Sequence, residues 1–147
     1  MKPFTLHAVL KYRRQLEDKA LQSLTRELQI EARLLTELQQ AEEELTGLYT
    51  DLEHDQQRGI SVDRLILFHQ RIDLVKDLVA RRQTALKKQQ AQVAKKRQIL
   101  LKASKDRKVI EKLEEQQNAN YKRQLEKLEA GMLDEIAVLS HERRRQQ

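Results

Sequence analysis

The stretch Asp55-Gln56-Gln57-Arg58-Gly59-Ile60-Ser61 decides the fold of this chain, because it is the one convincing turn between two long periodic segments. Gly59 is placed to end a helix in the left-handed region, and Ser61 is placed to cap the next helix. Asp63 then falls in the first helical turn, where the helix dipole favours a carboxylate. We expect helices over residues 5–57 and 62–140, a turn over 58–61 and a frayed basic tail over 141–147.

The composition outside this turn is typical of long helices and not of a compact globular domain. The 147 residues include one proline, three glycines, no cysteine, three tyrosines and two phenylalanines. A globular chain of this size needs more turn residues and more aromatic side chains. Sheets, disulfide frameworks and thiolate metal sites are excluded, and no run of about 18 apolar residues could span a membrane. We predict one all-α domain without direct membrane insertion or signal peptide, in the cytoplasm.

Apolar residues recur at alternating steps of three and four on both expected helices, which is the spacing of a left-handed coiled-coil seam. The first helix carries Leu34, Leu38, Ala41, Leu45, Leu48 and Leu52 at this spacing, and the second carries Leu65, Phe68, Ile72, Val75 and Val79. Near residues 110–121 the phase slips, which is typical of a stutter. The rhythm resumes in a new register at Tyr121, Leu125, Leu128, Met132 and Leu139.

A short turn between two such helices makes them antiparallel. Residue i of the first helix should then lie opposite a residue numbered about 119 minus i, which places Leu6 roughly opposite Leu113. About 25 residues of the second helix have no partner within the chain under this pairing. The predicted fold class is therefore an all-α, antiparallel two-helix coiled-coil hairpin with an overhanging C-terminal helix.

The net charge of +6 is divided unevenly along the chain. Residues 81–109, here called the basic stretch, contain eleven Lys or Arg and one acid, whereas residues 27–63 contain ten acids and two arginines. Antiparallel pairing brings part of the basic stretch opposite acids of the first helix, and leaves the stretch from Lys95 to Lys108 with a positive excess. A positive surface of this kind can orient the molecule in the field of an acidic partner.

Three interpretations of the basic stretch remain open. It is a solvated coiled-coil surface, a surface for a protein with acidic walls, or a nucleic-acid surface whose cations release phosphate counterions. The third is disfavoured because no aromatic residues for base stacking are interleaved with the cations, and because the cations flank the seam and do not precede it.

No residue pattern predicts catalysis or metal binding. The four histidines include no pair at the i, i+4 spacing of a helical zinc site. Asp51, Glu53 and Asp55 fail as a calcium loop, because Gln56 and Val62 stand where glycine and glutamate are required. There is no glycine-rich phosphate loop and no cysteine nucleophile. We expect no enzymatic activity, no cofactor and no metal.

Apolar and aromatic residues gather on both helices next to the turn. They are Leu48, Tyr49, Leu52, Leu65, Leu67 and Phe68. Since only one stripe of each helix can face the other helix, Tyr49 should lie at the edge of the seam and Leu67 should point elsewhere. The cluster either closes the hairpin tightly or forms a protein-docking patch, for which exposed aromatic residues are favoured anchors.

Three segments of the chain carry a family resemblance. They are the opening run Phe4-Thr5-Leu6-His7-Ala8-Val9-Leu10-Lys11-Tyr12-Arg13, the run Gln40-Ala41-Glu42-Glu43-Glu44-Leu45, and the turn Gly59-Ile60-Ser61 followed by Leu65, Phe68 and Ile72. Together they resemble the flagellar FliJ family of the bacterial type III export apparatus, over essentially the whole chain. The resemblance implies an antiparallel coiled coil similar to the stalk of the rotary ATP synthase gamma subunit.

The resemblance also implies partners and a location. Members of the family insert into the hexameric ring of the flagellar export ATPase, contact the cytoplasmic linker of the FlhA-like export gate protein, and escort export chaperones. These contacts imply a cytoplasmic protein that associates peripherally with the inner face of the cell membrane at the flagellar base. They also imply a role in ATPase ring assembly and in the coupling of energy to export.

Site residues follow from the resemblance position by position. Gate contact is attributed to an apolar and aromatic cluster near the turn, which here means Leu48, Arg71, Val75, Leu78 and Arg82, with Tyr49, Leu52 and Phe68 close by. Arg71 and Arg82 stand where some members carry aromatic and polar residues. Contact with the ATPase ring is attributed to the termini, which here means Lys95, Lys96, Arg97, Tyr121, Leu125, Leu128, Met132 and Leu139.

Two functions of other classes remain as alternatives. A purely structural coiled coil would form a homodimer through the overhang, and its mass would rise with concentration in sedimentation experiments. A basic helical nucleic-acid binder would lose affinity steeply as salt increases.

Overall fold

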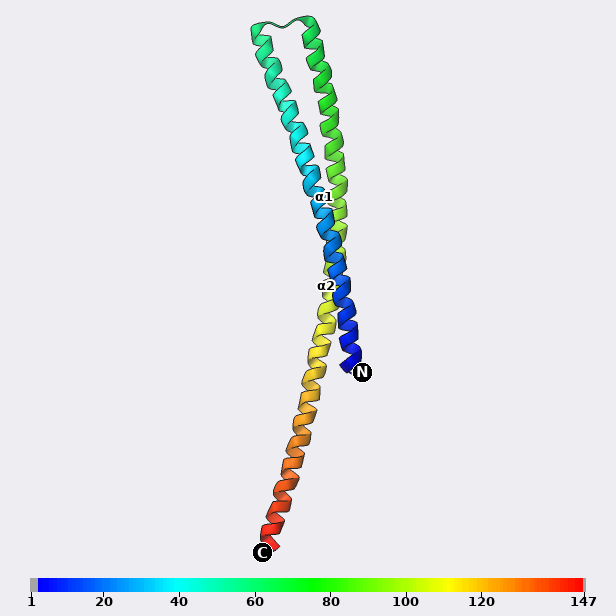
Figure 1. The fold of residues 1–147 in the computed structure, drawn as a ribbon, viewed down its shortest axis with the longest axis vertical. Coiled ribbons are helices and arrows are strands. Elements are labelled where there is room, and N and C mark those ends of the chain that lie inside the picture. The colour runs from blue at the N-terminus through cyan, green and yellow to red at the C-terminus, as the bar shows by residue number, and fades with distance from the viewer. Residues whose placement is uncertain (1–2, 147) are drawn as a thin grey trace. The chain divides into compact units, whose positions relative to one another are not determined.

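Two helices account for almost all of the computed structural model, which describes residues 3–146. Helix α1 spans Pro3–Arg58 and helix α2 spans Val62–Gln146. They lie antiparallel and form a hairpin (Figure 1), with no strand in the described part of the chain. The predicted all-α hairpin is confirmed. α1 starts two residues earlier than expected, and α2 continues six residues beyond 140, so residues 141–146 belong to the helix.

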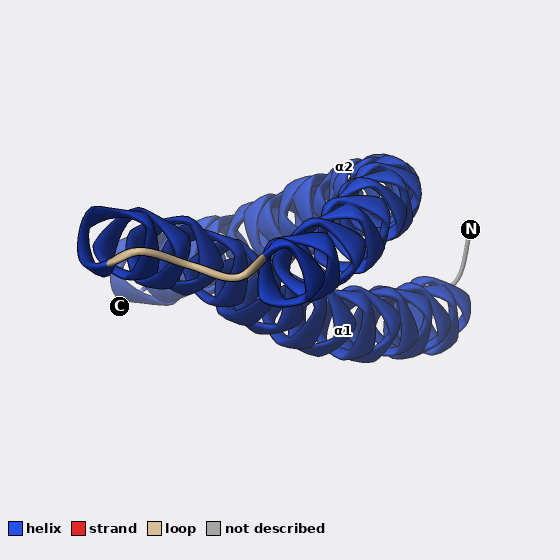
Figure 2. Cartoon of the chain, turned by 90° about the horizontal axis from the view of Figure 1, so that it is seen from above, coloured by secondary structure: helices blue, strands red, loops and turns tan. Residues whose placement is uncertain are grey.

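The turn forms as the sequence predicts. Gly59 has a φ angle of 92°, in the left-handed region, and its N–H donates to the carbonyl of Gln56 at 3.3 Å. Ser61 caps α2, because its Oγ accepts a hydrogen bond from the backbone N–H of Arg64 at 3.3 Å. The loop between the helices is consequently very short, as the tan segment in Figure 2 shows.

Contacts divide the chain into two compact units. Unit 1 combines Met1–Glu17 with Lys102–Gln147, and unit 2 is Asp18–Leu101. The boundary coincides with no helix end, because α1 and α2 both continue through it. Each unit is therefore a pair of antiparallel helical segments with its own seam.

The seam of unit 2 is mainly apolar. Its buried residues are Ala20, Leu24, Leu38, Ala41, Leu52, Ile72, Val75 and Val93. Polar pairs cross the seam between them: Arg82 Nη1 lies 2.5 Å from Glu37 Oε2, and the Gln89 side-chain amide donates to the backbone carbonyl of Glu27 at 2.9 Å. Closer to the turn, Arg71 pairs with Glu44, and Arg64 Nη2 lies 2.7 Å from Asp55 Oδ2.

The seam of unit 1 relies more on charge. Leu6 and Leu10 are its buried apolar residues within the described chain. Arg107 pairs with Glu17 on α1 and with Glu111 on its own helix. Further contacts between the two segments join Arg13 to Asp106 at 3.5 Å, Arg14 to Glu111 at 3.2 Å, and His7 Nδ1 to Glu114 at 3.8 Å.

These pairs confirm the antiparallel register. The residue numbers of the partners add to 115 for Glu44 and Arg71, to 119 for Glu37 and Arg82, and to 125 for Arg14 and Glu111. The values bracket the expected 119. Leu113 is 45% exposed and so lies outside the seam, which corrects its expected position opposite Leu6.

Seam positions continue in one register further along α2 than the apolar pattern indicates. Ala103, Arg107, Ile110, Glu114 and Gln117 are all partly covered at steps of four, three, four and three. The phase slip therefore lies in the last part of the expected range 110–121, after Gln117, because polar side chains occupy the last seam positions. Every residue from 118 to 146 is exposed, and we call this segment the overhang.

Candidate functional site

Several residues expected to contact an export gate are engaged in the seam of unit 2. Leu52 is buried at 7% exposure and Val75 at 3%. Leu48, Phe68 and Leu78 are half-buried. These side chains hold α1 and α2 together, so little of their surface is free for another protein.

Arginine and tyrosine side chains lie at the edges of this seam. Arg71 and Arg82 pair with Glu44 and Glu37 on the opposite helix. Tyr49 is 44% exposed, as expected for the edge, and the ammonium of Lys76 lies 5.8 Å from the centre of its ring. A hydrogen bond from Lys76 to Tyr49 raises the pKa of Lys76. Tyr49 is therefore an accessible aromatic side chain beside a fixed cation.

The most exposed apolar residues near the turn are not among those that the family resemblance assigned to the gate contact. They are Val62, Ile66, Leu67 and Leu74, which we call the outer patch. Leu67 and Leu74 are seven residues apart and each is 64% exposed. Leu67 thus points away from the seam, as expected. Periodicity could have identified Leu74, because it falls between the seam residues Ile72 and Val75 and so lies on the outer side of α2.

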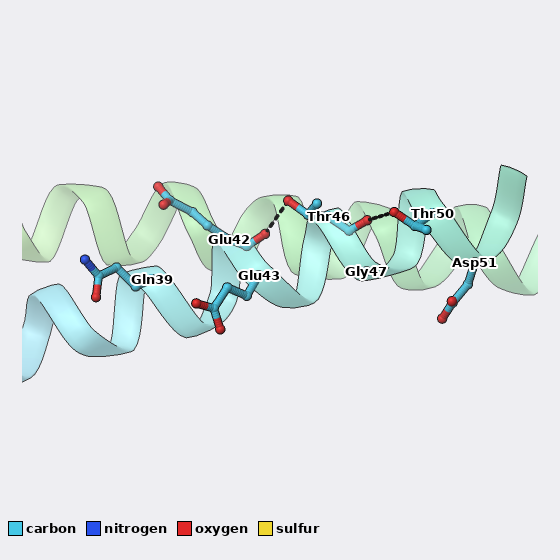
Figure 3. Close-up of a pocket in the computed structure, with 7 residues that line it drawn as sticks. All are labelled: Gln39, Glu42, Glu43, Thr46, Gly47, Thr50 and Asp51. Atoms are coloured by element: carbon cyan, nitrogen blue, oxygen red, sulfur yellow. Dashed lines mark hydrogen bonds between the residues drawn. The ribbon is translucent and has the colours of Figure 1, made fainter.

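A shallow acidic groove lies on α1 in unit 2 (Figure 3). Gln39, Glu42, Glu43, Thr46, Gly47, Thr50 and Asp51 line it. Gly47 leaves a gap in the helix surface, since no atom lies within 4 Å of where its Cβ would be. The hydroxyls of Thr46 and Thr50 donate to the backbone carbonyls of Glu42 and Thr46 at 3.0 Å each. The groove presents carboxylates and offers no activated nucleophile.

The basic stretch presents cations to solvent. Lys95 and Arg97 are exposed, and Lys96 is half-buried at the seam. Within unit 2, residues 81–101 contain seven Lys or Arg and no acid, while the facing residues 18–38 contain four acids and three Lys or Arg. Most of the positive charge of the basic stretch therefore stays uncompensated within the hairpin.

The overhang carries an apolar stripe along one side. Tyr121, Leu125, Leu128, Met132 and Leu139 fall on one helical face, together with Ile136, and their exposed fractions run from 42% to 65%. Ile136 was absent from the sequence-based set. Leu133, equally exposed at 66%, lies about 100° around the helix from Met132 and so off the stripe. The structure thus brings the predicted residues together on one surface without a partner for them.

Residues 3–146 present neither a metal cluster nor a helix suited to a membrane. No group of three or more His, Asp or Glu side chains is arranged to hold a metal ion among them. No helix within the same residues is long and apolar enough to cross a membrane.

A comparison with protein families decides the assignment. The family described as Flagellar FliJ protein matches residues 1–146. The chain belongs to the FliJ family. Comparisons with curated proteins and with solved structures gave no match. FliJ membership makes this chain a flagellar export-related protein and associates it with the flagellar export apparatus.

The fold of this FliJ family chain offers exposed surfaces and not an enclosed cavity. A helical hairpin without a concave, polar interior has little room for substrate. Its accessible features are surfaces: the outer patch, the acidic groove, the basic stretch and the overhang stripe. These surfaces are suited to contacts with other proteins.

Proposed function

We propose that this FliJ family protein is a coiled-coil stalk that binds the ring of the flagellar export ATPase and the export gate, and so promotes ring assembly and energy coupling. The observation that carries the proposal is the overhang, in which six apolar side chains form one stripe and face solvent. Apolar patches exposed in this way mark interaction sites.

Contact with the ATPase ring is assigned to the overhang stripe, with Lys95, Lys96 and Arg97 as a second contact. An exposed helix with a single apolar face inserts readily into a groove between partner helices. The uncompensated cations would accelerate association with acidic walls of the ring and orient the chain on approach.

Gate contact is assigned to the surface near the turn, with a change in the residues that make it. Leu52 and Val75 are buried between the helices, so the accessible anchors are Tyr49 and the outer patch. Arg71, 58% exposed and paired with Glu44, lies between Leu67 and Leu74 in the sequence and can contribute its exposed part. Escort of export chaperones is part of the proposal on the family resemblance alone.

The test uses purified chain and purified export ATPase. Leu128→Glu with Met132→Glu places charges on the stripe and should lower ATPase binding at least tenfold, since a buried unpaired carboxylate costs several kcal/mol. Leu133→Glu is the matched control, because it changes an equally exposed leucine off the stripe and should bind like the unmodified chain. Unchanged binding by the double variant would remove the overhang from the proposed contact.

A second measurement tests the basic stretch separately. Charge reversal at Lys95, Lys96 and Arg97 should reduce the association rate and the salt dependence of ATPase binding, and should impair motility of cells that depend on the variant. If binding and motility stay unchanged, the cations have no part in the contact.

A further inference from the structure

The overhang stripe is complementary to itself. Its first four apolar residues are symmetric about the midpoint between Leu125 and Leu128: Tyr121 and Leu125 precede this midpoint, and Leu128 and Met132 follow it. In an antiparallel pair of overhangs, Leu125 of one chain can lie opposite Leu128 of the other, and Tyr121 opposite Met132. We infer that the chain forms an antiparallel homodimer through the overhang, with a second copy of the chain covering these four residues of the stripe.

Charged residues beside the stripe fit this pairing. Lys122 and Glu129 are both exposed and follow Tyr121 and Leu128 directly in the sequence. In antiparallel coiled coils the residues at these flanking positions meet their equivalents across the interface. Lys122 of each chain therefore lies near Glu129 of the other chain, so that the dimer has two Lys–Glu ion pairs.

Glu135 selects this register over the alternatives. It directly precedes Ile136, at the position to which strict steps of three and four lead from Met132, and so lies at the edge of the stripe. A parallel dimer in register would place two Glu135 carboxylates against each other, and an antiparallel dimer shifted by one heptad would place Glu135 against Leu125. Both arrangements bury an unpaired carboxylate. In the inferred register Glu135 lies opposite Asn118, whose amide can donate a hydrogen bond to it.

The size of the interface predicts a weak dimer. Its apolar part runs from Tyr121 to Met132, whereas stable coiled coils sustain apolar seams over about three to four heptads. Small interfaces of this kind are typical of transient association, so the dimer should be populated at a chain concentration of about 100 μM and dissociate well below it. The dimer requires only the stripe and its flanking charges, and it does not depend on the proposed contact with the ATPase.

Sedimentation equilibrium of the chain alone tests the dimer. The mean mass should rise toward that of two chains with concentration, and Leu125→Glu should keep the chain monomeric, while Leu133→Glu should dimerise normally. A chain that stays monomeric up to about 1 mM would overturn the inference, because even millimolar dimers are then excluded. Circular dichroism of each variant checks that its helix content is unchanged.

Charge variants test the pairing of Lys122 with Glu129. Lys122→Glu alone turns two attractive pairs into repulsive ones and should weaken dimerisation about tenfold. Adding Glu129→Lys restores opposite charges and should return the dissociation constant to within about threefold of the original. Lys127→Glu is the control, because Lys127 lies on the opposite side of the helix. Failure of the double variant to recover would overturn this register.

Disulfide crosslinking tests the relative orientation of the two chains. Because the sequence has no cysteine, only the introduced cysteines can crosslink. Tyr121→Cys and Met132→Cys chains are mixed and oxidised. The inferred dimer joins the two different variants, because Cα atoms must lie within about 7 Å for a disulfide. Like chains should not crosslink, since positions 121 and 132 are about 16 Å apart along a helix. Predominant crosslinking between like chains would overturn the antiparallel arrangement. Binding of the ATPase plays no part in these measurements, so their failure is distinct from failure of the proposed function.

Discussion

At the scale of single residues, Gly59 and Gly47 differ in whether the backbone requires glycine. Gly59 adopts a φ of 92°, which side chains with a Cβ rarely accept, and it thereby allows α1 to end and the chain to reverse. Gly47 sits in the interior of α1 with open space around its Cα, where a helix gains from a side chain. The same substitution should therefore change stability in opposite directions at the two positions.

We predict that Gly59→Ala lowers the free energy of unfolding by about 1–2 kcal/mol, because alanine is strained in the left-handed region. Gly47→Ala should raise it by about 0.5–1 kcal/mol. Urea denaturation followed by circular dichroism measures both. A loss of stability in Gly47→Ala would show that the gap in the acidic groove has a structural role of its own.

Arg107 is the residue on which the charged seam of unit 1 centres. It pairs with Glu17 across the seam, and this hydrogen bond raises the pKa of the Arg107 guanidinium. A raised pKa means that folding favours the charged form, so the contribution to stability is present throughout the neutral range and is lost only at strongly alkaline pH. Salt and mutation, and not pH near neutrality, are the means of weakening this contact.

Replacing Arg107 should therefore loosen the N-terminal segment selectively. We expect Arg107→Gln to increase hydrogen exchange of backbone amides in residues 6–17 several-fold, with little change in residues 62–80. Exposed Lys108 provides the control variant, Lys108→Gln. Combining Arg107→Glu with Glu17→Arg should recover part of the protection, and equal exchange in all variants would show that Leu6 and Leu10 alone hold the segment.

At the scale of the helices, periodicity predicted most of the fold, while the site residues given by family resemblance stay predictions. The turn, the cap at Ser61 and the antiparallel register follow from local backbone preferences and from heptad spacing, which are properties of the sequence itself. The same spacing placed Val75 in the seam, and it is buried there. The gate contact that the resemblance assigns to Val75 stays a prediction.

Polar residues in the seam were harder to predict. Arg107, Glu114 and Gln117 extend the seam beyond the apolar pattern. Arg107 and Glu114 do so through partners on α1, Glu17 and His7, about a hundred residues away in the sequence. Hydrophobic spacing cannot reveal such pairs. Ile136 was missed for a related reason, since strict steps of three and four lead from Met132 to Glu135.

Leu74 and Val75 are neighbours in the sequence with opposite surroundings, and this gives a direct prediction. Val75→Ala should lower the free energy of unfolding by about 1–2 kcal/mol, because it leaves a cavity between the helices. Leu74→Ala should change it by less than about 0.5 kcal/mol, but should weaken binding to the export gate. Urea denaturation and a gate-binding assay measure the two effects, and a stability loss in Leu74→Ala would contradict its placement in the outer patch.

At the scale of the whole molecule, stability and charge are distributed unevenly. Eight of the ten buried apolar residues lie in unit 2, and Leu6 and Leu10 lie in unit 1. Unit 2 is also electrically divided: residues 34–80 hold ten acids and four Lys or Arg, while residues 18–33 and 81–101 together hold three acids and ten Lys or Arg. One unit thus provides a stable, polarised body, and the other provides the contacts that are easily opened.

Hydrogen exchange should rank the parts of the chain in this order. Residues 118–146 have no partner and should exchange fastest, residues 6–17 and 102–117 should be intermediate, and residues 18–101 should be slowest. Mass spectrometry of peptides from the intact chain gives the ranking at about 10 μM, where the dimer is dissociated. Slower exchange in the overhang than in unit 2 at this concentration would contradict the division.

The overhang is also where a protease should cut this chain first. It offers basic residues, among them Lys122, Arg123 and Lys127, on a helix that opens easily, and such segments are where proteases cut first. A chain held by a partner is shielded there, and an excess chain is not. The number of surviving molecules should then follow the number of binding places, so that supply is matched to assembly without any dedicated control of synthesis.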